Sequence, residues 1–155
     1  MDHLSVETPA FIYDEAAIGA DCARIARLAH ASGCKLLFSV KALAIAGVLE
    51  MVGRHVDGFS TSSLFESLLV SKVVGPAAVI HTTCPGLRAQ DLAEMVTTSN
   101  YLSFNSVSQL ELLGPAIDND VQLGIRVNPG VSLVSDARYD PCRKYSKLGA
   151  PLHEV

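Results

Sequence analysis

A lysine stands at the end of an apolar segment that is typical of a buried strand. Residues 36–40 are mostly apolar, Lys41 follows them directly, and the helix-like residues 42–46 come next. An amine at the exit of a buried strand is costly to desolvate without a partner, and α/β barrels place catalytic side chains at this position. A desolvated lysine amine has a lowered pKa, which is what Schiff-base chemistry requires. The segment alone also fits an ordinary surface lysine on a strand-to-helix loop.

Polar side chains end the other predicted strands as well. Arg126 interrupts the apolar run 123–127, and an arginine inside a buried strand normally has an anionic partner, which favours a functional or supporting role. Ser63 and Glu66 have the spacing of a capping box at the start of a helix, so a structural role explains them as well as a catalytic one. His81 is expected to be a hydrogen-bonded core histidine. The strand-end set comprises Lys41, Ser60 to Ser63, His81 to Cys84, Asn105, Ser106, Arg126 and Asn128.

The elements that position these residues alternate along the chain. A first helix is predicted over 16–31, with Asp14 as its N-cap and Ser32 and Gly33 closing it. Strands are then predicted over 36–40, 56–60, 77–81, 101–104 and 121–127, and helices over 42–53, 64–74, 87–97 and 107–113. The strands begin at intervals of about 21 residues, which predicts βα units on a parallel sheet. Residues 131–146 are expected to form an active-site loop or an irregular excursion.

The even spacing and the short loops favour an α/β fold of the TIM-type (β/α)8 barrel over a doubly wound sheet. No G-x-G-x-x-G follows the first strand, which argues against dinucleotide binding. A closed barrel needs eight strands, and five are visible. We therefore expect residues 1–155 to be the N-terminal part of a barrel domain, truncated after about five βα units; a small flavodoxin-like fold is the alternative.

Composition restricts the class of protein further. Of the 155 residues, 49% are hydrophobic and 18% charged, and the net charge is −4, which allows a sizeable core and argues against nucleic-acid or membrane-surface binding. No apolar run approaches the roughly 18 residues of a membrane span. The four cysteines form no CxxC pair and no zinc-ligand spacing, and no secretory signal is visible. We expect a cytoplasmic protein with reduced thiols and no metal.

Five pieces of the sequence resemble, in order, the fold-type III pyridoxal-phosphate decarboxylases, the group of ornithine and diaminopimelate decarboxylases. The pieces are TPAF at 8–11, FSVKA at 38–42, VDGFSTSSLFE at 56–66, RVNPG at 126–130 and YDPCRKYSKLG at 139–149. Several of them are shared with diaminopimelate decarboxylases. The SSLFE and YDPCR pieces point more narrowly to the branch that decarboxylates carboxynorspermidine or carboxyspermidine.

The resemblance implies a site for pyridoxal 5'-phosphate. Lys41 matches the lysine that forms the covalent imine with this cofactor. The positions close to the cofactor in the family match Ser60, Ser63 and Glu66, and those near its ring or hydroxyl match Arg126 and Lys147. Ser60 stands where ornithine decarboxylases carry an aspartate.

The resemblance also implies a function, namely decarboxylation of a small carboxylated polyamine in polyamine biosynthesis. It implies an alanine racemase-like barrel, a C-terminal β domain and a homodimer, with the phosphate-binding and substrate-binding residues further along the chain. The chain alone is then expected to be inactive and poorly folded. Three alternatives stay open: a diaminopimelate or other amino-acid decarboxylase of the same fold, a non-catalytic homologue, and a cofactor-free lysine aldolase.

Overall fold

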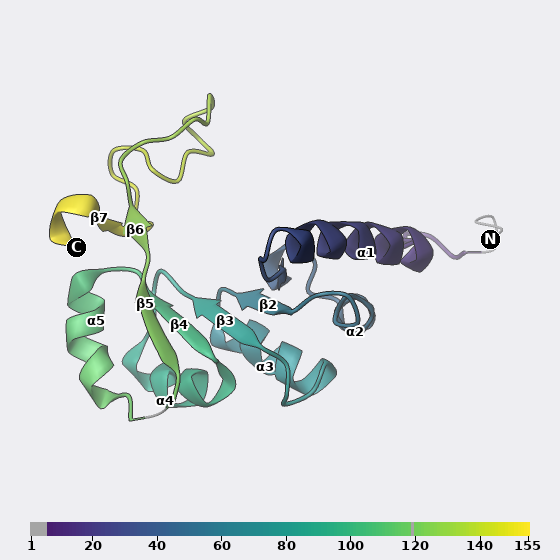
Figure 1. The fold of residues 1–155 in the computed structure, drawn as a ribbon, viewed down its shortest axis with the longest axis horizontal. Coiled ribbons are helices and arrows are strands. Elements are labelled where there is room, and N and C mark those ends of the chain that lie inside the picture. Colours follow the sequence, from purple (N-terminus) through teal and green to yellow (C-terminus); the bar gives the residue numbers. More distant parts are fainter. Residues whose placement is uncertain (1–5, 119) are drawn as a thin grey trace.

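Five parallel strands form one sheet in the computed structural model, which describes residues 6–118 and 120–155. The strands are β1 (Leu37–Ser39), β2 (Gly58–Thr61), β3 (Ile80–Thr83), β4 (Tyr101–Phe104) and β5 (Gln122–Ile125). They lie side by side in the order of the chain, and each pairs with the next in parallel (Figure 1). A doubly wound sheet reverses its strand order at a switch point, so this consecutive order excludes the flavodoxin-like alternative and matches the barrel arrangement.

Helices separate the strands and give the chain its βα rhythm. They are α1 (Glu15–Ala31), α2 (Ala46–Val52), α3 (Leu64–Val73), α4 (Ala89–Thr98) and α5 (Val107–Leu113). Asp14 caps α1 as predicted, because its Oδ1 accepts a hydrogen bond of 3.0 Å from the Ala17 amide. Ser32 ends the same helix, and Gly33 follows it with a φ of +67°, the left-handed conformation typical of a residue just past a helix end.

The two faces of the sheet differ in polarity. One face carries the large apolar side chains Phe59, Ile80, Leu102 and Phe104, all of them buried. These side chains belong to two clusters that include residues of α2, α3, α4 and α5, so the helices cover this face. Side chains alternate between faces along a strand, so the half-buried Ser60, His81, Tyr101 and Ser103 belong to the opposite face. This second face is called the open face below.

A network of buried hydroxyl groups lies among the apolar side chains on the helix-covered face. Thr82 Oγ1 lies 2.8 Å from Thr61 Oγ1, 3.1 Å from Ser67 Oγ and 2.7 Å from Ser99 Oγ. Thr61 and Ser67 also bond to each other at 2.8 Å. The network joins β2 and β3 to α3 and to the end of α4, and every hydroxyl in it has a partner, as buried polar groups require.

Most predicted bounds lie within two residues of the observed ones, but the starts of α2 and β3 were wrong by more. Residues 42–45 are not helical: Val40–Ala42 form a single 3-10 turn, Leu43 is extended with a φ of −161°, and α2 begins only at Ala46. Residues 40–45 lead the chain from the end of β1 to the start of α2, where the chain turns back along the sheet. Residues 77–79 precede β3 instead of opening it, since the Ala78 amide bonds to the Gly75 carbonyl in a turn.

The predicted fifth strand is interrupted at Arg126. Its amide donates to the Phe104 carbonyl of β4 at 2.8 Å, whereas its carbonyl accepts from the Ala150 amide at 2.7 Å. The backbone thus changes partner at this residue, and a second pair forms between β6 (Val127–Asn128) and β7 (Ala150–Pro151).

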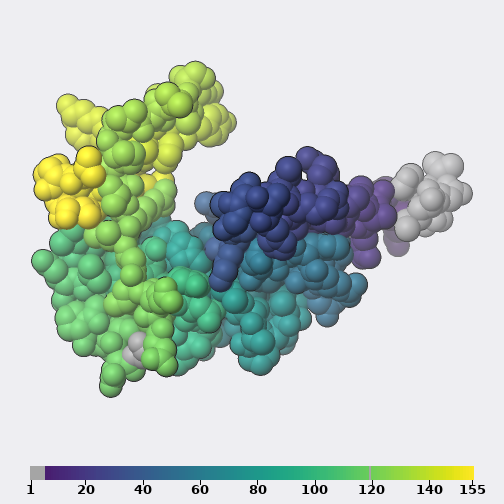
Figure 2. Space-filling view, in the orientation of Figure 1, coloured from purple at the N-terminus to yellow at the C-terminus, as the bar shows by residue number. Residues whose placement is uncertain are grey.

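Residues 129–149, between β6 and β7, form the predicted irregular excursion. They contain no helix or strand and project beyond the carboxyl ends of the strands (Figure 1). Figure 2 shows the surface hollowed between this excursion and α1. The described part of the chain has no helix that is both long and apolar enough to cross a bilayer.

Candidate functional site

Lys41 lies at the carboxyl end of β1, as predicted. The buried Val40 anchors the 3-10 turn beneath the helices, and Lys41 is its exposed neighbour. Within residues 6–118 and 120–155 its amine has no hydrogen-bond or ion-pair partner. The expected desolvation of the amine is not found, because Lys41 is exposed. The lysine is therefore an accessible amine on an anchored backbone.

Ser60 lies on the strand next to Lys41, where Ser39 and Ser60 are paired in register. Ser63 and Glu66 form the predicted cap of α3. The Ser63 Oγ accepts from the Glu66 amide at 3.3 Å, and the Glu66 carboxylate accepts from the Ser62 amide at 2.7 Å. These contacts fix the turn after β2, which is the structural role that the spacing suggested.

Arg126 lies at the far side of the sheet from Lys41. Neighbouring strands are about 4.8 Å apart, so four strand spacings put β1 and β5 roughly 19 Å from each other along the sheet. Arg126 as a residue is half-buried, and the anionic partner expected for its guanidinium is not found among the described residues. A half-buried cation without a partner is a group that an anionic ligand can complete.

Lys147 belongs to a segment that is docked onto the end of β4. The Asn105 amide nitrogen donates to the Lys147 carbonyl at 2.7 Å, and the Gly149 amide donates to Asn105 Oδ1 at 2.9 Å. Gly149 has a φ of +87°, and a Cβ there would lie 2.9 Å from the Asn128 amide nitrogen. The glycine is therefore required for this close approach, and the lysine side chain stays exposed.

His81 and Ser103 form a hydrogen-bonded pair on the open face. The Nε2 of His81 lies 2.8 Å from the Oγ of Ser103. Burial lowers the pKa of the His81 imidazole below its usual value. The predicted hydrogen bond of His81 is confirmed, but Ser103 had not been singled out. Ser103 lies between Leu102 and Phe104 in β4, and side chains alternate between the faces of a strand, so its hydroxyl belongs to the face opposite those two apolar side chains. This alternation is the pattern in the sequence that could have identified it.

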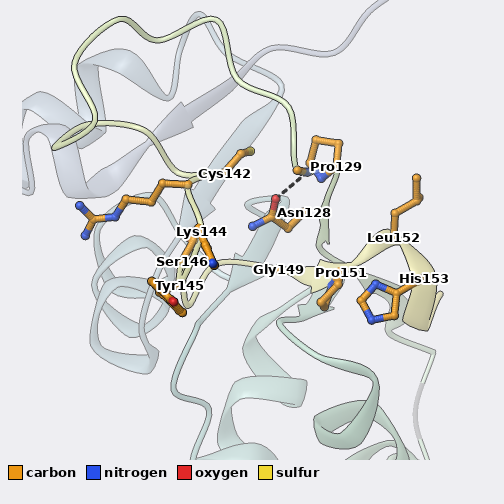
Figure 3. A pocket seen from close by; sticks show the side chains of 12 residues that line it. Asn128, Pro129, Cys142, Lys144, Tyr145, Ser146, Gly149, Pro151, Leu152 and His153 are labelled. Atoms are coloured by element: carbon orange, nitrogen blue, oxygen red, sulfur yellow. Dashed lines mark hydrogen bonds between the residues drawn. The ribbon is translucent and has the colours of Figure 1, made fainter.

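A cavity of about 340 Å³ opens between the excursion and the β6–β7 pair. Figure 3 shows Asn128, Pro151 and His153 on one side of it and Lys144 and Tyr145 on the other. Its lining includes Arg143 and Lys144 and no carboxylate. Tyr145 has a φ of +71°, unusual for a residue with a side chain. The described residues contain no cluster that could hold a metal ion.

The groups on the open side of the sheet fit part of a pyridoxal phosphate molecule. Lys41 offers an accessible amine for the aldehyde, and Arg126, which has no partner within residues 6–118 and 120–155, offers a cation for an anionic group. Lys41 follows β1 and Arg126 follows β5, the two outermost strands of the sheet, so they would approach the ligand, or a ligand and a substrate together, from different strands.

The chain belongs to the pyridoxal-dependent decarboxylases: residues 16–155 match the model of their pyridoxal binding domain. The family and cofactor that the sequence predicted are confirmed by this match, as is the α/β fold class. More particularly, the chain is 30% identical over 149 residues to a carboxynorspermidine/carboxyspermidine decarboxylase from Campylobacter jejuni and 30% identical over 144 residues to one from Herminiimonas arsenicoxydans. These alignments cover 96% and 93% of this chain.

A solved structure agrees with these relatives. The crystal structure of carboxynorspermidine decarboxylase from Campylobacter jejuni, complexed with norspermidine, matches with a TM-score of 0.80 and 27% identity. The match covers 94% of this chain and 36% of the solved chain. Likewise, the chain spans 38% and 39% of the length of the two curated relatives.

Proposed function

We propose that this chain forms the lysine-bearing part of a pyridoxal-phosphate-dependent decarboxylase that acts on carboxynorspermidine or carboxyspermidine and yields norspermidine or spermidine. The observation that carries the proposal is the exposed amine of Lys41 at the carboxyl end of β1, which has no partner in the part of the chain that the structure describes, in a chain of this family. The names of the relatives support the polyamine substrate.

Each predicted site residue has a proposed role in this reaction. Lys41 attaches the cofactor through Nζ, and Ser60 borders it from the neighbouring strand. Ser63 and Glu66 act indirectly, by fixing the turn that follows Ser60. Arg126 supplies a positive charge for an anionic group of cofactor or substrate. Pyridoxal phosphate, when bound, supplies an electron sink for the electron pair that departing carbon dioxide leaves behind.

Lys147 is proposed as a second cation of the same site. The Asn105 side chain donates to the Lys147 carbonyl and accepts from the Gly149 amide, and these two bonds hold the backbone of this segment against the end of β4. The Lys147 side chain then projects from a fixed point beside the Arg126 backbone, with which Ala150 pairs.

We further propose that residues 1–155 form the first five βα units of a barrel domain, that the full enzyme is a cytoplasmic homodimer, and that its ligand is a small carboxylated polyamine. The consecutive strand order and the length of the relatives support the domain assignment. The net charge of −4 supports a cationic small-molecule ligand over nucleic acid.

The test is a labelling experiment on the chain with pyridoxal phosphate. Borohydride reduction followed by peptide mass analysis should place the phosphopyridoxyl mass on Lys41 in preference to the other lysines. Those lysines are Lys35, Lys72, Lys144 and Lys147. The Lys41→Ala variant should lose the preferred label, and the matched Lys35→Ala variant should retain it. Equal labelling of all the lysines would refute the assignment of Lys41.

A further inference from the structure

The open face carries the imidazole of His81, which has no role in the proposed reaction. His81 lies on the middle strand of the sheet, paired in register with Ser60 on one side and Tyr101 on the other. Ser60 is in turn the register partner of Ser39, two residues before Lys41. A continuous row of side chains thus connects the strand of the lysine with His81.

The imidazole of His81 is held in one orientation. Its Nε2 bonds to Ser103 Oγ, and Ser103 lies two residues beyond the register partner of His81, nearer the carboxyl end of the sheet. The ring therefore leans toward the end where Lys41 lies. The Tyr101 ring packs edge-on against it with centroids 6.4 Å apart, and Gly124 leaves room for Ser103, because a Cβ there would lie 3.3 Å from the serine Oγ.

The second ring nitrogen of His81 is unused. Its Nδ1 makes no hydrogen bond to any residue that the structure describes, whereas the hydroxyl groups on the helix-covered face all satisfy one another. Because burial lowers the pKa of His81, the ring is neutral at neutral pH and keeps one donor and one acceptor nitrogen. A fixed, neutral, half-satisfied imidazole is suited to a polar small molecule.

We propose that His81 contacts pyridoxal phosphate through Nδ1 when the cofactor is attached at Lys41, and that Ser103 is a positioning residue that acts through His81. This inference rests on the proposed function, because it takes the cofactor to be bound at the Lys41 end of the open face. It extends the site from β1 and β2 to β3 and β4.

The test combines a resonance measurement with the labelling assay. Histidine ring signals of the 15N-labelled chain are followed during titration with pyridoxal phosphate, with His30, at the end of α1, as the internal control. The His81 signals should move, and those of His30 should not. The rate of borohydride-trapped labelling at Lys41 should fall roughly two- to tenfold in Ser103→Ala, the factor that corresponds to one net hydrogen bond, and Ser103→Thr should restore it.

The outcomes separate the two proposals. Labelling confined to Lys41 with His81 signals as unchanged as those of His30 would overturn the role of His81 and leave the proposed function standing. Absence of preferred labelling at Lys41 would overturn both. A Ser103→Thr variant that labels as slowly as Ser103→Ala would refute the positioning role of the hydroxyl, since the loss would then come from packing alone.

Discussion

Removing the central hydroxyl of the buried network should destabilise the chain strongly. The substitution is Thr82→Val, which replaces a hydroxyl with a methyl group of similar size and leaves the backbone of β3 unchanged. The Thr82 Oγ1 has three partners, at 2.7, 2.8 and 3.1 Å. Thr61 and Ser67 keep their bond to each other, but Ser99 loses the hydrogen-bond partner of its buried hydroxyl.

The magnitude follows from those contacts. A net hydrogen bond contributes about 0.5–1.5 kcal/mol, and a buried polar group that is left without a partner costs about 1–3 kcal/mol. The variant loses three hydrogen bonds and leaves the Ser99 hydroxyl without a partner, and the added methyl group regains part of this loss by packing. Together these effects lower the free energy of unfolding by about 2–4 kcal/mol. For a domain of this size that is a large part of the total stability.

Urea denaturation followed by far-UV circular dichroism measures this loss as a lower transition midpoint at unchanged slope. The matched control is Thr83→Val on the same strand, because its hydroxyl makes one long bond of 3.4 Å to the Ser103 carbonyl. Thr82→Val combined with Ser99→Ala should cost less than the sum of the two single changes, since the stranded hydroxyl is then absent. A loss below about 1 kcal/mol for Thr82→Val, or full additivity of the pair, would refute the reasoning.

Three further predictions concern the cap of α3, the segment docked on β4, and acid stability. Ser63→Ala should lower the free energy of unfolding by about 1 kcal/mol in the urea assay, because the Glu66 amide loses its acceptor. Gly149→Ala should speed proteolytic cleavage within the excursion, because the added Cβ clashes with the backbone at Asn128. The hydrogen bond from the Leu36 amide, together with His30, lowers the pKa of Asp57. The ionised Asp57 carboxylate therefore stabilises the fold above the usual carboxyl pKa, and this stabilisation is lost as pH falls through the lowered value. Thermal midpoints of wild type and Asp57→Asn, compared from pH 7 to pH 3, should therefore converge as pH falls.

Each of these predictions has a contrary result. A Ser63→Ala variant as stable as the exposed-site control Ser108→Ala would contradict the capping role. Equal cleavage rates for wild type and Gly149→Ala would mean that the close approach at Asn128 does not hold the excursion. A gap between wild type and Asp57→Asn that stays constant down to pH 3 would exclude Asp57 as the source of the acid sensitivity.

Local sequence patterns predicted most of the fold where an element is stabilised by its own residues and nearest neighbours. The bounds of β4 and α5 were predicted correctly because Ser106 caps the helix directly after the strand. The start of α1 was predicted to within one residue from Asp14, and the Ser63 cap of α3 was predicted correctly. Capping residues act within three or four positions, so a single sequence contains the whole interaction.

The remaining features depend on contacts between distant residues. The break at Arg126 comes from the hydrogen bond to Ala150, and the docking of Lys147 comes from Asn105, 42 residues earlier. The apolar residues 77–79 look like a strand, yet the turn at Gly75 and the register with β2 place the beginning of β3 at Ile80. Ser103 was missed for the same reason: its importance comes from a histidine on the neighbouring strand.

The consecutive order of the strands also bears on how the chain reaches its structure. Leu37 pairs with Gly58, Phe59 with Ile80, and Tyr101 with Gln122, each 21 residues later in the chain. Each pairing therefore closes a loop of nearly the same length, at nearly the same cost in chain entropy, and none has to wait for a distant segment. Such a sheet can grow by one βα unit at a time in the direction of synthesis, with each completed strand serving as the template for the next, as in repeat proteins that propagate from neighbour to neighbour.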